Sequence, residues 1–480
     1  MAILKKHKNE VHSKNQYHLI LYLLTKKIEM KKITLITILF LTATLNAQCW
    51  SSFDSGGGNT VALKSDGSLW AWGANYEGQL GIGNNVDQYF ITRVGTDSNW
   101  VSVETGDSDS FAIKSDGTLW GWGRNEYGQL GIGSAGQSLI PIQVGTDTDW
   151  KSVSNHGYHT LALKMDNTLW GWGNETVYFG FINSMVPVQI GTDTWKSINT
   201  GQHYVMGIKT DGTLWAWGRN EYGVFGNGST TNQPNGPIQI GDENQWDNIA
   251  VFSDHTMAIK LDGSLWGWGG NFYGQLGDGT VTSRLVPTRI GTGNNWESVN
   301  SGYLTTHAIK TDGTLWASGF NSSGQLGDGT TLTRVTPVQI GTSTNWKLLQ
   351  PNFNYCQVGL KDDGKLYGWG SNQYGQTSGD GNNFQHNSPT LINCPALGVN
   401  SLLLKDLITF FPNPTKNIVH ITSKGNITSV QLFDVQGRVL ETMTMNDESV
   451  DFDLSQKSSG VYFVKVFTVK GVKVEKVIKE

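Results

Sequence analysis

Residues 111–123 read Phe-Ala-Ile-Lys-Ser-Asp-Gly-Thr-Leu-Trp-Gly-Trp-Gly, and the 480-residue chain contains seven versions of this phrase. The intervals between successive versions are 45–51 residues. A fixed period of this length is typical of repeat architectures such as solenoids and propellers. The Asp-Gly step of the phrase, which is Asp-Asn in the third version, begins at Asp66, Asp116, Asp166, Asp211, Asp262, Asp312 and Asp363.

Each repeat contains four short runs of strand-forming residues. In the second repeat, two runs flank Asp116-Gly117, a dipeptide that favours a two-residue type I′ hairpin turn. Residues 100–103 and 142–144 predict two further strands, and Pro141 stands at the start of the last one, where its missing N–H does least harm. Four strands per unit are typical of a propeller blade. The repeats therefore predict an all-β fold, a seven-bladed β-propeller.

The third repeat departs from the others between residues 174 and 187. This stretch lacks the Gly-Gln-Leu-Gly turn of the other units and is about five residues shorter. Since the Leu-Trp-Gly-Trp-Gly core of the unit is intact, we expect a trimmed loop within a retained blade.

All 19 tryptophans lie between Trp50 and Trp369 and occupy three columns of the repeat. The first column precedes the first strand of each unit. The second ends the Leu-Trp step, and Tyr367 replaces one of its tryptophans. The third precedes a glycine, and Ser318 replaces one of its tryptophans. Large rings at fixed positions suit sheets that pack face to face, so we expect them to form the contacts between blades. Stacking on sugar rings is the alternative interpretation.

The combination Leu-Trp-x-Trp-Gly-x-Asn-x-x-Gly-Gln-Leu-Gly, repeated over residues 49–394, resembles the regulator of chromosome condensation (RCC1-like) repeat family. The resemblance implies a seven-bladed propeller, which agrees with the count of repeats. The founder of the family is a guanine-nucleotide exchange factor on chromatin. Other members, including a secreted bacterial β-lactamase inhibitor, use the propeller to bind protein. A shared fold does not by itself carry a shared function.

The C-terminal residues have a different composition, without Trp or Asp-Gly, and alternating apolar runs that predict a small β-sandwich. Phe-Phe-Pro-Asn-Pro at 410–414, Asp-Val-Gln-Gly-Arg at 434–438, Ser-Gly-Val-Tyr at 459–462 and the basic end resemble the C-terminal sorting domain of the type IX secretion system (Por). The resemblance implies export across the outer membrane by that machinery. An ordinary accessory β-domain is the alternative.

The N-terminal region predicts a targeting segment. A basic start at residues 30–32, an apolar run and the small residue Ala47 are typical of a signal peptide. We therefore expect a secreted or cell-surface protein. The expected segments are a start-site extension (1–29), a signal peptide (30–47), the propeller (48–395), a linker (396–406) and the sorting domain (407–480).

Charge and address limit the partners. Residues 48–400 contain 17 Lys and Arg against 29 Asp and Glu, a net charge of −12. A nucleic-acid partner would require a basic surface, so we expect none. A small GTPase would not meet a protein outside the cell, so we do not expect that partner either. The expected partners are the type IX secretion machinery and an extracellular protein or glycan, and we expect a monomer.

Three cysteines are present. Cys49 precedes the first Trp, and Cys394 lies in the column of the Thr that follows Ile-Gly in other units. In an ordinary unit these columns are about three residues apart, as Thr96 and Asn99 are, so ring closure would bring the two cysteines together. An exported protein permits a disulfide, which we predict between Cys49 and Cys394, with two separate thiols as the alternative. Cys356 is expected to be buried.

Catalytic motifs are absent from the sequence. His-Glu-x-x-His, Cys-x-x-Cys and Gly-x-Ser-x-Gly do not occur, and the Asp-Gly phrase differs in spacing from the Asp-box of sialidases. Asp278 and Asp328 in Leu-Gly-Asp-Gly-Thr suggest calcium, but turn chemistry explains them without a metal. We expect no catalytic residue, no metal and no cofactor, and hence a non-catalytic protein.

The loop between the first two strands of each unit varies most, so it is the predicted recognition surface. Aromatic and histidine side chains in such loops suit a protein or glycan ligand. The alternatives are ordinary loop packing, a polysaccharide lyase or hydrolase that uses channel-facing His and Asp, and a secreted enzyme inhibitor. The candidate ligand-binding residues are Tyr158, His159, His203, Tyr204, Phe252, His255, Tyr303, Phe353 and Tyr355.

Overall fold

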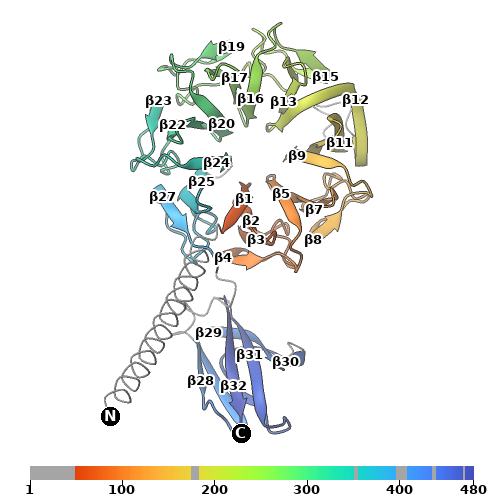
Figure 1. The fold of residues 1–480 in the computed structure, drawn as a ribbon, viewed down its shortest axis with the longest axis vertical. Helices are drawn as coiled ribbons and strands as arrows, with labels where there is room; N and C mark the ends of the chain where they lie inside the picture. Colours follow the sequence, from red (N-terminus) through yellow and green to blue (C-terminus); the bar gives the residue numbers. More distant parts are fainter. Residues whose placement is uncertain (1–48, 175–182, 351–354, 396–407, 435–438, 469–470) are drawn as a thin grey trace, which may run out of the picture. The chain divides into compact units, whose positions relative to one another are not determined.

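The computed structural model describes residues 49–174, 183–350, 355–395, 408–434, 439–468 and 471–480. These ranges contain β-strands and no helix. The expected start-site extension, signal peptide and linker all lie outside the described residues. The strands form a ring of blades and a separate C-terminal β-domain (Figure 1).

Within the described ranges, 27 strands form seven antiparallel blades around a central channel, with the first strand of each blade innermost (Figure 1). The first blade comprises β1 (Trp50–Ser55), β2 (Asn59–Lys64), β3 (Leu69–Gly73) and β4 (Gln88–Arg93), and the second β5 (Trp100–Thr105), β6 (Asp109–Lys114), β7 (Leu119–Gly123) and β8 (Ser138–Gln143). The third and fourth comprise β9 (Trp150–His156), β10 (His159–Lys164), β11 (Thr168–Asn174), β12 (Asn183–Thr200), β13 (Tyr204–Lys209), β14 (Leu214–Gly218) and β15 (Gln233–Gln239). The fifth comprises β16 (Trp246–Val251), β17 (His255–Lys260), β18 (Leu265–Gly269) and β19 (Arg284–Arg289), and the sixth β20 (Trp296–Gly302), β21 (Thr305–Lys310), β22 (Leu315–Gly319) and β23 (Arg334–Gln339). The seventh comprises β24 (Trp346–Gln350), β25 (Cys356–Lys361), β26 (Leu366–Gly370) and β27 (His386–Ile392).

The third and fourth blades share one long strand. β12 pairs with β11 through its first part and with β13 from Trp195 onward, so that the two blades form one seven-stranded sheet. The chain has one residue fewer between Gly191 and Trp195 than between Gly95 and Trp100, which removes the turn that separates other blades. The third blade is retained, as expected, and the trimmed loop at 175–182 lies outside the described residues.

The Asp-Gly hairpin turn differs from the type I′ turn that the dipeptide predicts. Gly117 has a φ of +80°, but Asp116 is not among the residues with positive φ. The N–H of Gly117 donates to the carbonyl of Lys114 at 2.9 Å, and Asp116 Oδ1 accepts from Thr118 N and Oγ1. The turn is therefore a type I turn followed by a glycine bulge, because the Asp carboxylate is held by the residue two positions on.

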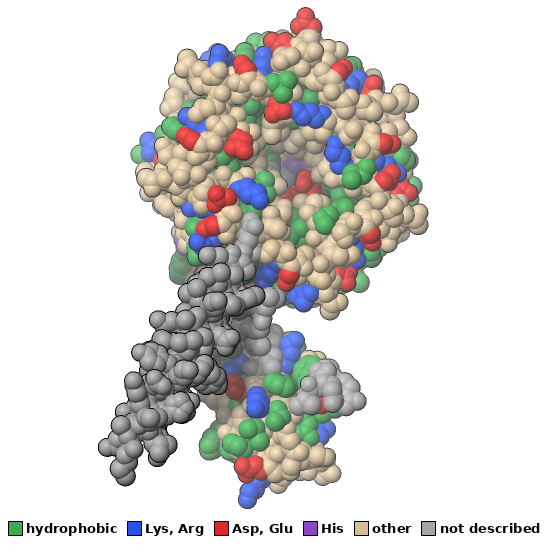
Figure 2. Space-filling view, in the orientation of Figure 1, with side chains coloured by type: hydrophobic (Ala, Val, Ile, Leu, Met, Phe, Trp, Pro, Cys, Tyr) green, Lys and Arg blue, Asp and Glu red, His purple; other side chains and the backbone are tan. Residues whose placement is uncertain are grey.

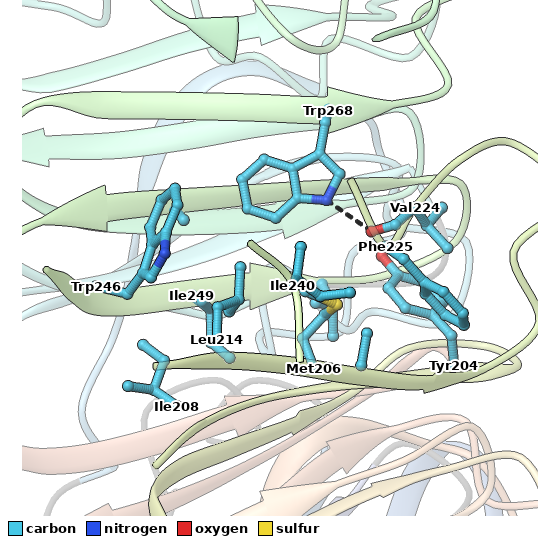
Figure 3. Packing of buried hydrophobic residues seen from close by; sticks show 13 residues of the cluster. Tyr204, Met206, Ile208, Leu214, Val224, Phe225, Ile240, Trp246, Ile249 and Trp268 are labelled. Atoms are coloured by element: carbon cyan, nitrogen blue, oxygen red, sulfur yellow. Dashed lines mark hydrogen bonds between the residues drawn. The ribbon is translucent and has the colours of Figure 1, made fainter. Parts of the chain in front are cut away.

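Tryptophans form the contacts between blades, which confirms the packing interpretation. Trp122 Nε1 donates to the carbonyl of Gln79 in the preceding blade at 2.9 Å, and Trp268 Nε1 donates to that of Val224 at 2.7 Å. Figure 3 shows Trp268 and Trp246 packed with Met206 and its neighbours between the fourth and fifth blades. Truncating a buried Trp costs about 3–5 kcal/mol, so these columns carry much of the stability.

A lysine column covers the remaining tryptophans. The lysine that precedes each turn places Nζ 3.5–4.4 Å from the centroid of the ring that ends the Leu-Trp step. Lys260, for example, lies 4.0 Å from the Trp266 ring and 4.7 Å from the Trp246 ring, and its Nζ contacts Glu243 at 2.7 Å. The lysine recurs at this position of the sequence repeat, and the structure shows that it makes cation–π contacts with the tryptophans.

The ring closes without exchange of a strand. Trp72 Nε1 and Thr60 Oγ1 of the first blade donate to the carbonyl of Gln376 in the seventh, as Trp122 and Ser110 do to that of Gln79. The structure contains the predicted disulfide between Cys49 and Cys394. Lys64 Nζ donates to the Pro395 carbonyl at 2.6 Å beside it. Cys356 is buried and free.

The C-terminal domain is a five-stranded sheet that curls around one apolar core. Its strands are β28 (Ile408–Phe411), β29 (Ile418–Phe433), β30 (Val439–Asp453), β31 (Gly460–Thr468) and β32 (Gly471–Lys479). β28 pairs with the first part of β29 and β31 with the last part, while β30 runs along its other edge. A bridge between Thr415 and Lys479 brings the two ends of the sheet together.

Candidate binding face

One side of the ring, here called the loop face, collects two loops from each blade. The loop between the first two strands and the loop after the third strand open on the same side, because Asn59 at the start of β2 pairs with Gly73 at the end of β3. Contacts between blades join the two loops, as where Tyr76 Oη lies 2.9 Å from Ser108 Oγ. The Asp-Gly turns lie at the opposite ends of the strands.

Four of the nine candidate residues are buried: His159, Tyr204, Phe252 and His255. Tyr204 Oη donates to the His255 carbonyl at 2.7 Å, and burial raises the Tyr204 pKa. His255 Nε2 lies 3.1 Å from Thr306 Oγ1, and burial lowers the His255 pKa to about 4, which keeps the ring neutral. Phe252 packs edge-on against His156. These side chains join blades and offer little surface to a ligand.

Four other candidate residues reach the loop face, and Phe353 lies outside the described residues. Tyr158 packs against Tyr127 in a tilted arrangement, with 4.4 Å between ring centroids. Tyr303 and Tyr355 meet edge to face at 5.2 Å. His203 lines a small hollow between the fourth and fifth blades. The nine residues therefore do not form one continuous site.

A second aromatic column on this face was missed. The Asn-x-Tyr-Gly segment after the third strand recurs from blade to blade, as a structural segment does, yet several of its aromatic side chains are exposed. The rings connect with the predicted ones: Phe320 lies 5.8 Å from Tyr355 and 4.8 Å from Tyr273. A signal was available, since Glu77 and Ser323 replace the Tyr of this segment in two repeats, whereas a core position would stay constant. The exposed members are Tyr76, Tyr127, Tyr222, Phe272 and Tyr273.

Several polar and charged side chains line the hollow between the fourth and fifth blades. Arg219, Glu221 and Asp254 line it together with Gln202 and His203. Arg219 forms an ion pair with Glu221. Burial raises the pKa of Asp254, and the charge of Arg219 opposes that rise. The hollow therefore presents both donors and acceptors within reach of the exposed Tyr222 ring.

The central channel is a separate polar space of about 350 Å³, lined by the innermost strands. Figure 2 shows acidic and histidine side chains inside the hollow of the ring. Asp54 and Glu104 line it from the first two blades. Burial raises the Asp54 pKa to about 7. Burial, and to a lesser extent the charge of Asp54, raises the Glu104 pKa well above its usual value.

Asp54 has a structural role in the channel. Asp54 Oδ2 accepts from the backbone N–H of Thr105 at 2.6 Å, and Ser154 Oγ accepts from that of Thr200 at 3.0 Å. Innermost strands are sheet edges, whose N–H groups need acceptors. The same position in the other blades supplies polar side chains with one exception, Ala250. The set is Asp54, Glu104, Ser154, Asn199, Ala250, Asn300 and Gln350.

The described part of the chain holds no group of three or more His, Cys, Asp or Glu side chains arranged for a metal ion. Asp278 Oδ1 accepts from Thr280 N, and its Oδ2 accepts from Arg284 Nε at 2.7 Å, so turn chemistry explains this residue. Asp328 makes the same bonds to Thr330 and Arg334. None of the described segments forms a helix that could cross a bilayer.

Sequential four-stranded blades joined by Trp-to-carbonyl bonds define a repeat β-propeller with one loop-rich face. The RCC1-like domain model matches residues 41–352, and the RCC1 repeat model matches residues 358–376. The chain belongs to the RCC1-like domain family, which confirms the expected family. Residues 409–480 match the secretion system C-terminal sorting domain, which directs type IX export to the cell surface or the medium.

Known relatives agree with this assignment. The ultraviolet-B receptor UVR8 of Arabidopsis thaliana is 33% identical over 183 residues, which are 37% of this chain and 41% of the receptor. The match thus spans less than half of that relative. Human WBSCR16 has a TM-score of 0.60 at 20% identity, with 69% of this chain and 96% of that chain covered. Yeast RCC1 (Prp20), solved bound to Kap60, has a TM-score of 0.62 at 18% identity, with 73% and 86% covered. These two likenesses show the fold.

Proposed function

We propose that this protein is a non-catalytic binding propeller of the cell exterior, whose loop face engages an extracellular protein or polysaccharide. The observation that carries the proposal is the exposure of aromatic rings on that face. Phe272 is 56% exposed and Tyr76 is 52% exposed. Clustered exposed aromatic side chains mark interaction sites, since they offer large contact area at low cost in side-chain entropy.

The aromatic rings are held ready for a ligand. Tyr303, Tyr355, Phe320 and Tyr273 form an unbroken series of ring contacts across the fifth, sixth and seventh blades. Side chains that already touch one another lose little freedom when a ligand binds, which favours affinity. The net charge of −12 over residues 48–400 supports a partner other than nucleic acid.

An enzyme that uses the channel is the rival. Its carboxylates at Asp54 and Glu104 have raised pKa values, as catalytic acids often do. The bonds from Thr105 to Asp54 favour the structural role instead. Release of reducing sugar by the purified protein from any polysaccharide would contradict the non-catalytic proposal. A secreted inhibitor would use the same face, and its ligand would be an enzyme.

The test uses the intact exported protein on a glycan array and in surface plasmon resonance against extracellular proteins. Replacing both Tyr273 and Tyr355 by Ala should weaken binding at least about tenfold, because each ring contributes about 1 kcal/mol or more. The melting temperature should stay within about 1 °C, since both rings are exposed. The matched control replaces by Ala the exposed Met165 and Leu261, which lie in turns at the opposite ends of the strands. Equal loss in the control pair would show that the chosen face is wrong.

A further inference from the structure

Two of the seven repeats carry the same pentapeptide. Residues 124–128 and 219–223 both read Arg-Asn-Glu-Tyr-Gly, in the second and fourth blades. The arginine is what distinguishes these units. The other blades have Ala74, Asn174, Gly270, Phe320 and Ser371 in its place.

Both pentapeptides are held in the same conformation. Asn125 Oδ1 accepts from Leu130 N at 2.9 Å, and Asn220 Oδ1 accepts from Phe225 N at 3.0 Å. In each, the arginine is paired with the glutamate two residues on, at 2.8 Å between Arg124 Nη2 and Glu126 Oε2. Each therefore presents an Arg, a Glu and a Tyr side chain in a fixed arrangement on the loop face.

Each pentapeptide also meets an aromatic ring. Tyr127 packs against Tyr158 of the third blade at a tilt, with the Arg124 guanidinium 5.1 Å from the Tyr158 centroid. Tyr222 meets Phe272 of the fifth blade edge to face, with 5.8 Å between centroids. A planar donor, a carboxylate acceptor and an aromatic surface thus lie together at two places on one face.

This combination suits the chemistry of a sugar unit. The C–H face of a pyranose stacks on an aromatic ring, while its hydroxyls accept from a guanidinium and donate to a carboxylate. Arg and Glu neutralise each other at both places, and residues 48–400 carry a net charge of −12. Electrostatics therefore favours a neutral ligand over a polyanion.

We infer that the two Arg-Asn-Glu-Tyr-Gly segments are paired subsites for a neutral polysaccharide with a repeating unit. Identical subsites on one face suit a ligand that presents the same group twice, as a repeating polymer does and a single protein surface does not. This inference rests on the proposed binding function and names its ligand class. Engagement of both subsites by one chain raises its overall affinity by about 10²-fold or more.

The test is affinity electrophoresis of the intact exported protein through gels that contain laminarin, xylan, mannan or galactan. The variants are Arg124→Ala, Arg219→Ala and the double change, and the matched control is Arg289→Ala, which removes an arginine whose Nη2 donates to the Thr292 carbonyl. Each single change should weaken binding of a retained polymer by about 10²-fold, and the double change should abolish retardation. Calorimetry with a short oligosaccharide of the same polymer should give two sites for the parent and one for each single variant.

Other outcomes separate this inference from the proposed function. Absence of retardation in every gel overturns the inference, as does retardation that the double variant retains. If a protein ligand then binds and the Tyr273→Ala, Tyr355→Ala variant loses it, the binding function stands and the polysaccharide inference falls. If neither polysaccharides nor proteins bind the loop face, both fall.

Discussion

The backbone N–H of Trp50 donates to the carbonyl of Gly364 at 3.1 Å, and the N–H of Trp100 makes the same bond to Gly67 at 3.2 Å. The first pair joins the two ends of the ring, and the second joins neighbouring blades. The seam between the seventh and first blades is therefore built like an ordinary blade junction. What it lacks is a continuous chain across it, and the Cys49–Cys394 disulfide supplies a covalent link there.

Loss of the disulfide should destabilise the propeller. A cross-link that closes so long a loop contributes up to about 5 kcal/mol by restricting the unfolded chain, and native strain reduces this value. We expect Cys49→Ser to lower the melting temperature by several degrees, measured by circular dichroism without reductant. The parent protein, unfolded without reductant, should have one alkylatable thiol, that of Cys356. Three reactive thiols would contradict the link.

The propeller should become less stable as pH rises from about 4 to 7. Burial raises the Asp54 pKa to about 7 from a usual value near 3.8, so the folded state binds this proton more tightly than the unfolded state does. This stabilisation is complete below the pKa that Asp54 has in the unfolded chain, and it is lost as pH rises through the pKa in the folded protein. The free energy of unfolding falls by at most about 4 kcal/mol over this range. Urea unfolding at several pH values should be measured for the parent and for Asp54→Asn, which keeps an acceptor for Thr105. The free energy of unfolding should depend less on pH in the variant than in the parent. Equal slopes would contradict the assignment.

Removing a lysine from its tryptophans should cost stability without changing the fold. Lys260 lies over Trp266 and Trp246, so Lys260→Met should lower the free energy of unfolding by about 1–2 kcal/mol, through loss of cation–π attraction and of the contact to Glu243. The control is Lys151→Met, which removes an exposed lysine whose Nζ donates to Asn167 Oδ1 at 2.6 Å. Tryptophan fluorescence during urea unfolding measures both. A Lys260 variant as stable as the control would leave the lysine column without an energetic role.

The sorting domain should be required for release. Deleting residues 407–480 removes β28–β32 and the matched sorting segment, so the propeller should accumulate in the periplasm. Immunoblots of periplasm, surface and medium fractions measure this. Circular dichroism of the periplasmic form should retain the β-sheet spectrum, which separates failed export from misfolding. Appearance of the truncated protein in the medium would show that residues 407–480 are dispensable for traffic.

The fold could be predicted because it depends on positions that repeat. A Trp before each first strand and a Trp before each following glycine must meet a neighbouring blade, so their spacing defines both the blade and its junctions. Cys49 and Cys394 could be paired because ring closure aligns their columns. The shared strand β12 could not be predicted in this way. One residue is missing before Trp195, and the sequence does not show that this deletion replaces a turn by continuous strand.

The candidate site was harder to predict because sequence variation does not reveal exposure. Tyr204 and His255 follow variable loops, but each begins a strand and faces the next blade, where it bonds backbone or hydroxyl groups. Tyr127 and Tyr273 stand within a repeated segment, yet their rings reach solvent because the neighbouring Asn and Gln side chains hold the turn. The direction of a side chain on a tight loop depends on local hydrogen bonds of this kind, which the sequence alone does not show.

Because every blade is complete in consecutive sequence, the point at which the chain enters the ring is structurally arbitrary. A circular permutant that joins residues 49 and 394 by a short linker and opens between β19 and β20 would retain every blade and exchange one junction for another. The order of the blades in a gene is thus free to rotate.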